Sequence, residues 1–125
     1  MIETKLTNTD PNIILVKFSG RISLEEVGND RAFGEIIKGL NGAPFSVVCD
    51  FADAVIMSEE VSKVFIKAQS FAVDRGMIRD AFVCTSAVIR LQFSRIARES
   101  GRAKSLGKLR FFETAEEAYA YINSK

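Results

Sequence analysis

Two patterns of apolar residues alternate along this chain of 125 residues. Short continuous apolar runs bounded by turn-forming residues are typical of buried strands, and apolar residues spaced three and four apart are typical of helices with one face against a core. The runs predict five strands, at 2–6, 13–18, 45–50, 81–84 and 109–112. The spacing predicts four helices, at about 24–40, 59–73, 86–100 and 115–122. The expected order is β-β-α-β-α-β-α-β-α.

The order of these elements predicts the fold class. The two opening strands are separated by Asn8–Asn12, a segment dense in turn-forming residues, and are expected to form an antiparallel hairpin. Strands and helices then alternate, which indicates a largely parallel sheet with helices as crossovers. Phe45–Asp50 has little polar alternation, which is typical of a central strand covered on both faces. We therefore expect one α/β domain over residues 1–125, built on a mixed five-stranded sheet backed by helices.

The first expected helix contains two residues that weaken it. Gly28 and Gly34 each cost up to about 1 kcal/mol relative to alanine. Ser23 and Glu26 stand three positions apart, the spacing of a capping box that begins a helix, and Gly42 is a natural stop. We expect one helix between these limits.

Composition removes several classes of enzyme. The chain has no histidine, which excludes histidine-assisted serine or cysteine hydrolysis and histidine-containing metal sites. Glu59 and Glu60 are adjacent, so on a helix their side chains point about 100° apart and cannot flank one bond. Cys49 and Cys84 lack the spacing of a redox pair and are expected to be buried free thiols in a reducing compartment. We expect no catalytic residue, no metal site and no cofactor.

Targeting signals are not apparent in the sequence. No apolar run approaches the roughly 18 residues of a membrane span. The segment Met1–Leu6 lacks the basic head and apolar block of a signal peptide. The protein is therefore expected in the cytoplasm, without an integral membrane segment.

Charge is distributed unevenly although the net charge is only +1. Residues 86–110 carry seven basic side chains and one acidic one. Among them Arg95, Arg98 and Arg102 share one face of the expected helix, which indicates either a solvated face or a surface for an anion or an acidic partner. Nucleic acid is not an expected partner, because no aromatic stacking platform is interleaved with this charge.

Polar residues gather where the expected central strand gives way to the next helix. In open α/β sheets, sites usually lie at such junctions. The junction offers Asp50, Asp53, Ser58, Glu59 and Glu60. Ser58 with the two glutamates either caps the helix or forms the edge on which a partner docks, and Asp50 is either a site residue or the cap of its own turn. Thr85 and Ser86, at the start of the following helix, are expected nearby.

Three local motifs, together with the element order, resemble a known family. Val16–Ile22 resembles a strand followed by the G-x-(I/L) entry into a first helix, Val47–Asp50 resembles a central strand that ends in aspartate, and Phe111–Ala118 resembles a closing strand followed by an acidic helix start. Over essentially its whole length the chain resembles the STAS domain of bacterial anti-sigma-factor antagonists, most of all the small SpoIIAA-like (STAS/SEC14-like) group. The resemblance implies a STAS-like fold and a regulatory module that docks on a protein partner.

The phosphorylation motif of the antagonists is not matched here. In that family an Asp-Ser-Ser-Gly motif follows the central strand, and its second serine is phosphorylated by the cognate kinase. In this sequence Ser58 falls on the motif's aspartate, Glu59 and Glu60 on its serines, and Val61 on its glycine. A carboxylate carries one charge against nearly two for phosphoserine, so an acid at the acceptor position would imitate the phosphorylated state only in part.

Two functions of different classes follow. The leading one is a non-catalytic regulatory module whose contact with a protein partner centres on Asp50–Val61, with the Ser86 helix start beside it. The alternative is a carrier of a small apolar ligand or lipid, with a pocket under the helix Val61–Val73 that some of the ten phenylalanines would wall. An enzyme without a recognisable motif is a distant third, and the sequence leaves open whether the chain forms a homodimer.

Overall fold

The computed structural model describes residues 1–124 and contains one five-stranded sheet. The strands are β1 (Ile2–Asn8), β2 (Asn12–Gly20), β3 (Phe45–Ala54), β4 (Met77–Val83) and β5 (Phe111–Phe112). The helices are α1 (Leu24–Asn29), α2 (Ala32–Gly39), α3 (Glu59–Asp74), α4 (Ala87–Glu99), α5 (Arg102–Leu106) and α6 (Ala115–Ile122). The strands lie in the order β1-β2-β3-β4-β5, with β1 antiparallel to β2 and the other neighbours parallel. The predicted α/β class, the opening hairpin and the central place of β3 are confirmed.

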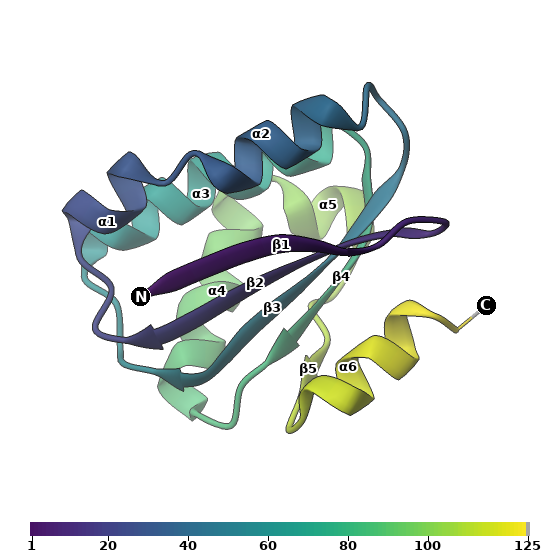
Figure 1. Cartoon of the computed structure of the whole chain (residues 1–125). Helices are drawn as coiled ribbons and strands as arrows, with labels where there is room; N and C mark the ends of the chain where they lie inside the picture. Colours follow the sequence, from purple (N-terminus) through teal and green to yellow (C-terminus); the bar gives the residue numbers. More distant parts are fainter. Residues whose placement is uncertain (125) are drawn as a thin grey trace.

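The helices form two unequal layers on the sheet (Figure 1). Successive side chains of a strand point to opposite faces, so β3 supplies both cores. Phe45, Val47 and Phe51 enter the larger core, which α1 to α5 cover. Val48 enters the smaller core, which α6 closes with Ala118. In the described residues no helix has the length and apolar character needed to cross a bilayer.

The first helix is not continuous as expected, because the chain breaks at Asp30 and Arg31. Asp30 has an extended backbone, and its Oδ1 accepts a hydrogen bond from the backbone N–H of Ala32 at 3.1 Å. A short acidic side chain bonded to the backbone two residues on competes with the helical hydrogen bond. The single helix is thus replaced by α1 and α2, with Gly28 and Gly34 on either side of the break.

A second departure follows α4, which ends within one residue of the predicted position. Gly101 adopts a left-handed backbone with φ 82°, a conformation that costs glycine little. The chain then forms α5, which sequence periodicity did not predict. Because Arg102 belongs to α5 and not to α4, its side chain no longer shares a face with Arg95 and Arg98.

Candidate functional site

The junction between β3 and α3 is a structured turn. The Oδ1 of Asp50 accepts a hydrogen bond from the N–H of Ala52 at 3.0 Å, so Asp50 does cap its own turn. The N–H of Val55 donates to the carbonyl of Gly20 at 3.1 Å, which holds the end of β3 beside the end of β2. Asp53 is exposed. Hydrogen bonds from β2 and from β3 therefore fix the backbone of the junction.

Two of the polar residues at the start of α3 form hydrogen bonds within the molecule. The Ser58 hydroxyl accepts a hydrogen bond from the N–H of Val61 at 3.2 Å, as expected of an N-cap. The Glu59 carboxylate accepts two hydrogen bonds from the Arg95 guanidinium, at 2.5 and 3.1 Å. These bonds lower the pKa of Glu59 and raise the pKa of Arg95. Glu60 is exposed and has no ion-pair partner within residues 1–124.

The start of α3 is clamped to α4 by one amide side chain. Gln92 donates from Nε2 to the Met57 carbonyl at 2.8 Å and accepts from the Met57 N–H at 3.4 Å. Both backbone groups of a residue before α3 are thus satisfied by α4. Together with the Glu59–Arg95 ion pair, this clamp ties the junction to α4.

The junction and α4, joined in this way, both expose apolar side chains. Val55 and Ile56 in the junction are 46% and 55% exposed, and Val88 and Leu91 on α4 are 47% and 71% exposed. These are four of the eight large apolar side chains that are exposed in the described residues. Acidic residues border them. We call the set the junction surface: Asp53, Val55, Ile56, Glu60, Val88 and Leu91.

The two polar residues predicted at the α4 start lie at the edge of the junction surface. The Ser86 hydroxyl accepts a hydrogen bond from the N–H of Ile89 at 3.3 Å and caps α4. Thr85 is exposed beside it. The structure therefore places one of them in a capping role and leaves the other accessible.

The predicted three-arginine surface is wrong. Arg95 is bound by Glu59 and, at 3.1 Å, by Glu99, and Arg98 is exposed. Arg102 is only 2% exposed, because the left-handed Gly101 turns it toward the sheet.

Arg102 instead forms a buried ion pair with Asp80 of β4, which is also 2% exposed. Its Nε donates to both oxygens of the Asp80 carboxylate at 2.9 and 3.1 Å, and its Nη2 donates to Oδ1. Its Nη1 donates to the carbonyl of Gly107. The sequence pattern does not indicate Asp80, because the apolar run that predicts this strand begins one residue later and the spacing of Arg102 places it on a helix face.

A cavity of about 380 Å³ lies between the sheet, the α1–α2 pair and α3. Its wall is mostly apolar, with residues from β2, β3, β4, α3 and α4: Val16, Phe18, Val47, Phe65, Phe82 and Phe93. Cys49 and Asp80 are the polar residues that line it from the sheet. Burial, followed by the negative charges of Asp80 and Asp50, raises the pKa of the Cys49 thiol, and Arg102 opposes the shift. The cavity lies under the helix where the sequence placed the alternative ligand pocket.

Metal-binding groups do not gather in the part of the chain that the structure describes. No three histidine, cysteine, aspartate or glutamate side chains there are close enough together to hold an ion. Cys49 and Cys84 are both free thiols, the first half-buried against the cavity and the second buried.

Comparison with known proteins identifies only the fold of this chain. No protein-family model and no curated protein matches the sequence. Among solved structures, an uncharacterised protein of the DUF3478 family with a SpoIIAA-like fold, from Shewanella loihica PV-4, is similar with a TM-score of 0.65 at 16% identity. The match covers 97% of this chain and 91% of that one.

Two structures of the anti-sigma factor antagonist SpoIIAA are also similar. The unphosphorylated form matches with a TM-score of 0.62 at 12% identity, over 98% of this chain and 96% of that one. The phosphorylated form, described as a Bacillus cell fate determinant, matches with a TM-score of 0.61 at 14% identity, over 98% of this chain and 100% of that one. The chain thus has the SpoIIAA-like fold, the STAS-type α/β architecture that its sequence resembles.

Proposed function

We propose that the chain is a non-catalytic regulatory module that docks on a protein partner through the junction surface. The observation that carries the proposal is the set of exposed apolar side chains on the junction and on α4, two segments that the Gln92 clamp joins. Exposed apolar patches with polar borders are typical of interaction sites. The structural similarity to SpoIIAA, an anti-sigma factor antagonist by its description, supports the same interpretation.

The charges of the junction surface specify the chemistry of the partner. Asp53 and Glu60 are exposed and unpaired among residues 1–124, whereas Glu59 is occupied by Arg95. The expected partner therefore presents an apolar patch with lysine or arginine at its border. Salt should weaken the complex, since charges at the border of an interface are screened.

Site-specific photo-crosslinking tests the proposal. A benzophenone amino acid at Leu91 should give a discrete adduct with one protein in cells of the source organism, and the same residue at Ile78, which is exposed on the opposite end of β4, should not. The captured protein is then titrated against Glu60→Lys, which should weaken binding about tenfold or more. Glu60 is the better position for charge reversal, because Glu59→Lys would also break an intramolecular ion pair.

Two results would count against this function. Equal adducts from Leu91 and Ile78 would show contact without a defined site. An adduct of twice the chain's mass would show that the junction surface meets a second copy of this chain instead of a different protein.

The cavity supports a second candidate function, the carriage of a small apolar ligand. Ligand pockets in proteins are mostly apolar and span about 300 to 1,000 Å³, and this cavity lies at the small end of that range. A native mass spectrum of the purified chain should show a non-covalent adduct that denaturation removes. A bare mass, both as purified and after incubation with medium-chain apolar compounds, would contradict ligand carriage.

A further inference from the structure

The mouth of the cavity is formed by small residues on facing helices. Gly28 of α1 and Gly34 of α2 line it from either side of the helix break, and Ala68 of α3 lines it opposite. A Cβ atom built on either glycine would meet nothing within 4 Å, and neither glycine has a positive φ. Backbone geometry therefore does not require glycine at these positions, and a side chain there would extend into open space.

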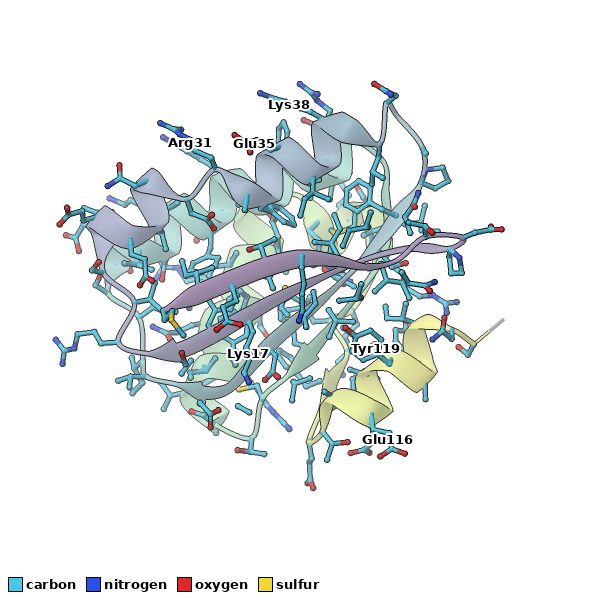
Figure 2. The ribbon with its side chains drawn as sticks, in the orientation of Figure 1. Lys17, Arg31, Glu35, Lys38, Glu116 and Tyr119 are labelled. Atoms are coloured by element: carbon cyan, nitrogen blue, oxygen red, sulfur yellow. The ribbon has the colours of Figure 1, made fainter. Side chains whose placement is uncertain are left out.

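The charged residues at the mouth are mostly cationic. Arg31 and Lys67 are exposed, and in the described part of the chain no carboxylate lies within ion-pair distance of either. Figure 2 shows Arg31 projecting from the start of α2 on the side away from the sheet, so its guanidinium lies outside the cavity. The acidic residue at the mouth is Asp30, whose Oδ1 already accepts a hydrogen bond from the N–H of Ala32.

The interior, in contrast, offers no free charge. Asp80 is neutralised by Arg102, and the pKa of the Cys49 thiol is raised by burial, so the thiol is neutral at physiological pH. The apolar walls of β2, β3 and α3 make up the rest of the space. A ligand that matches both regions has an apolar chain inside and a negative group at the mouth.

We infer that the cavity takes up a medium-chain anionic amphiphile, tail first, through the opening beside Gly34, and that Arg31 and Lys67 hold its negative group. This inference rests on the second candidate function, ligand carriage, and names the class of ligand. A volume of about 380 Å³ holds roughly a dozen groups the size of a water molecule at about 30 Å³ each. A chain of roughly eight to twelve carbons therefore fits inside.

Isothermal titration calorimetry with dodecanoate and dodecanol, each below its solubility limit, distinguishes the contribution of the negative group to binding from that of the apolar chain. The unmodified chain should bind dodecanoate at least about tenfold more tightly than dodecanol. Arg31→Gln combined with Lys67→Gln should remove this preference and leave dodecanol binding unchanged. Lys38→Gln is the matched control, because Lys38 also projects outward from α2 (Figure 2) and does not line the cavity.

A second pair of variants tests the opening itself. Gly34→Leu should weaken the binding of both compounds about tenfold or more, and Gly39→Leu should not. Gly39 belongs to the same helix and also has open space around its Cβ position, but it does not line the cavity. Thermal melts of both variants should match or exceed that of the unmodified chain, because leucine favours a helix more than glycine does.

The outcomes distinguish the inference from the function on which it rests. Equal affinity of the unmodified chain for the two compounds would overturn the anionic class and leave ligand carriage standing. Unchanged binding to Gly34→Leu would overturn the proposed entrance. Binding of neither compound would overturn both the inference and ligand carriage.

Discussion

Replacing Arg102 with methionine should destabilise the fold severely, because it would leave the Asp80 carboxylate buried without a partner. Within residues 1–124 every hydrogen bond of that carboxylate comes from Arg102. Breaking a buried ion pair on one side typically costs about 3 to 5 kcal/mol. The Gly107 carbonyl also loses its donor, but Gly107 is exposed, so water can replace that hydrogen bond at little further cost. This cost approaches the lower end of the stability of a small domain, which is about 5 to 15 kcal/mol.

The double variant Asp80→Leu with Arg102→Met should be far more stable than the two single variants predict. Apolar residues of similar volume often replace a buried ion pair at little cost. Asp80→Leu alone leaves the buried Arg102 guanidinium without its carboxylate partner and should also cost about 3 to 5 kcal/mol. If the double variant costs about 2 kcal/mol, the coupling energy between the two positions is at least about 4 kcal/mol.

Urea unfolding followed by far-ultraviolet circular dichroism measures this cycle, since the chain has no tryptophan to report by fluorescence. A single variant that is unfolded in buffer can be measured in an excluded osmolyte, with every member of the cycle in the same solvent. Arg95→Met is the comparison variant. It breaks a pair whose side chains are about half exposed and should change stability far less. Additivity of the two single costs within about 0.5 kcal/mol would refute the reasoning.

Two further predictions concern residues near the junction surface and the cavity. Gln92→Ala should lower the free energy of unfolding, measured by urea titration, by roughly 1 to 3 kcal/mol, because both Met57 backbone groups lose their partner. The control Leu91→Ala should change it by no more than about 0.5 kcal/mol. Equal effects of the two variants would contradict the clamp. Because the pKa of Cys49 is raised in the folded chain, the free energy of unfolding should fall as pH rises above about 8.5, where the unfolded thiol ionises. Cys49→Ala should make this fall shallower, and an unchanged slope would show that Cys49 does not contribute.

Most of the architecture could be predicted from the sequence because each element carries its own periodicity. Phe45–Asp50 is apolar on both faces, and the structure places β3 at the centre of the sheet. The three-and-four spacing over 59–73 predicted α3 to within one residue. Such signals are local, and a strand or helix repeats them several times, so one irregular residue does not obscure them.

The candidate site was harder to predict from the sequence, because contacts between residues distant in sequence position its key side chains. Arg102 was assigned to a helix face by spacing alone, although the expected helix ended at about residue 100. Its partner, Asp80, lies 22 positions earlier at the edge of an apolar strand. No periodicity relates the two, and only the folded chain shows that one neutralises the other.

The cavity illustrates a different limit. A hydrophobic pattern indicates which residues face a core, but it does not indicate whether side chains fill that core completely. The same phenylalanines can line the cavity and pack on another ring: Phe18 lines it and stacks on Phe51 at 4.3 Å between ring centroids, so the spacing of these residues does not reveal the space. The sequence did contain one local sign, the two glycines inside an otherwise helical pattern.

Several departures from local rules lie around this cavity, and their position supports a functional origin. The broken helix, the helical glycines Gly28 and Gly34, and the buried ion pair of Asp80 all border one space. On the other face of the sheet α6 follows the rules closely, with Thr114 capping its start and Ala118 fully buried. Features that lower stability persist where a site requires them. The cavity therefore calls for a functional explanation, and the binding of a ligand between the opposed helices α2 and α3 supplies one.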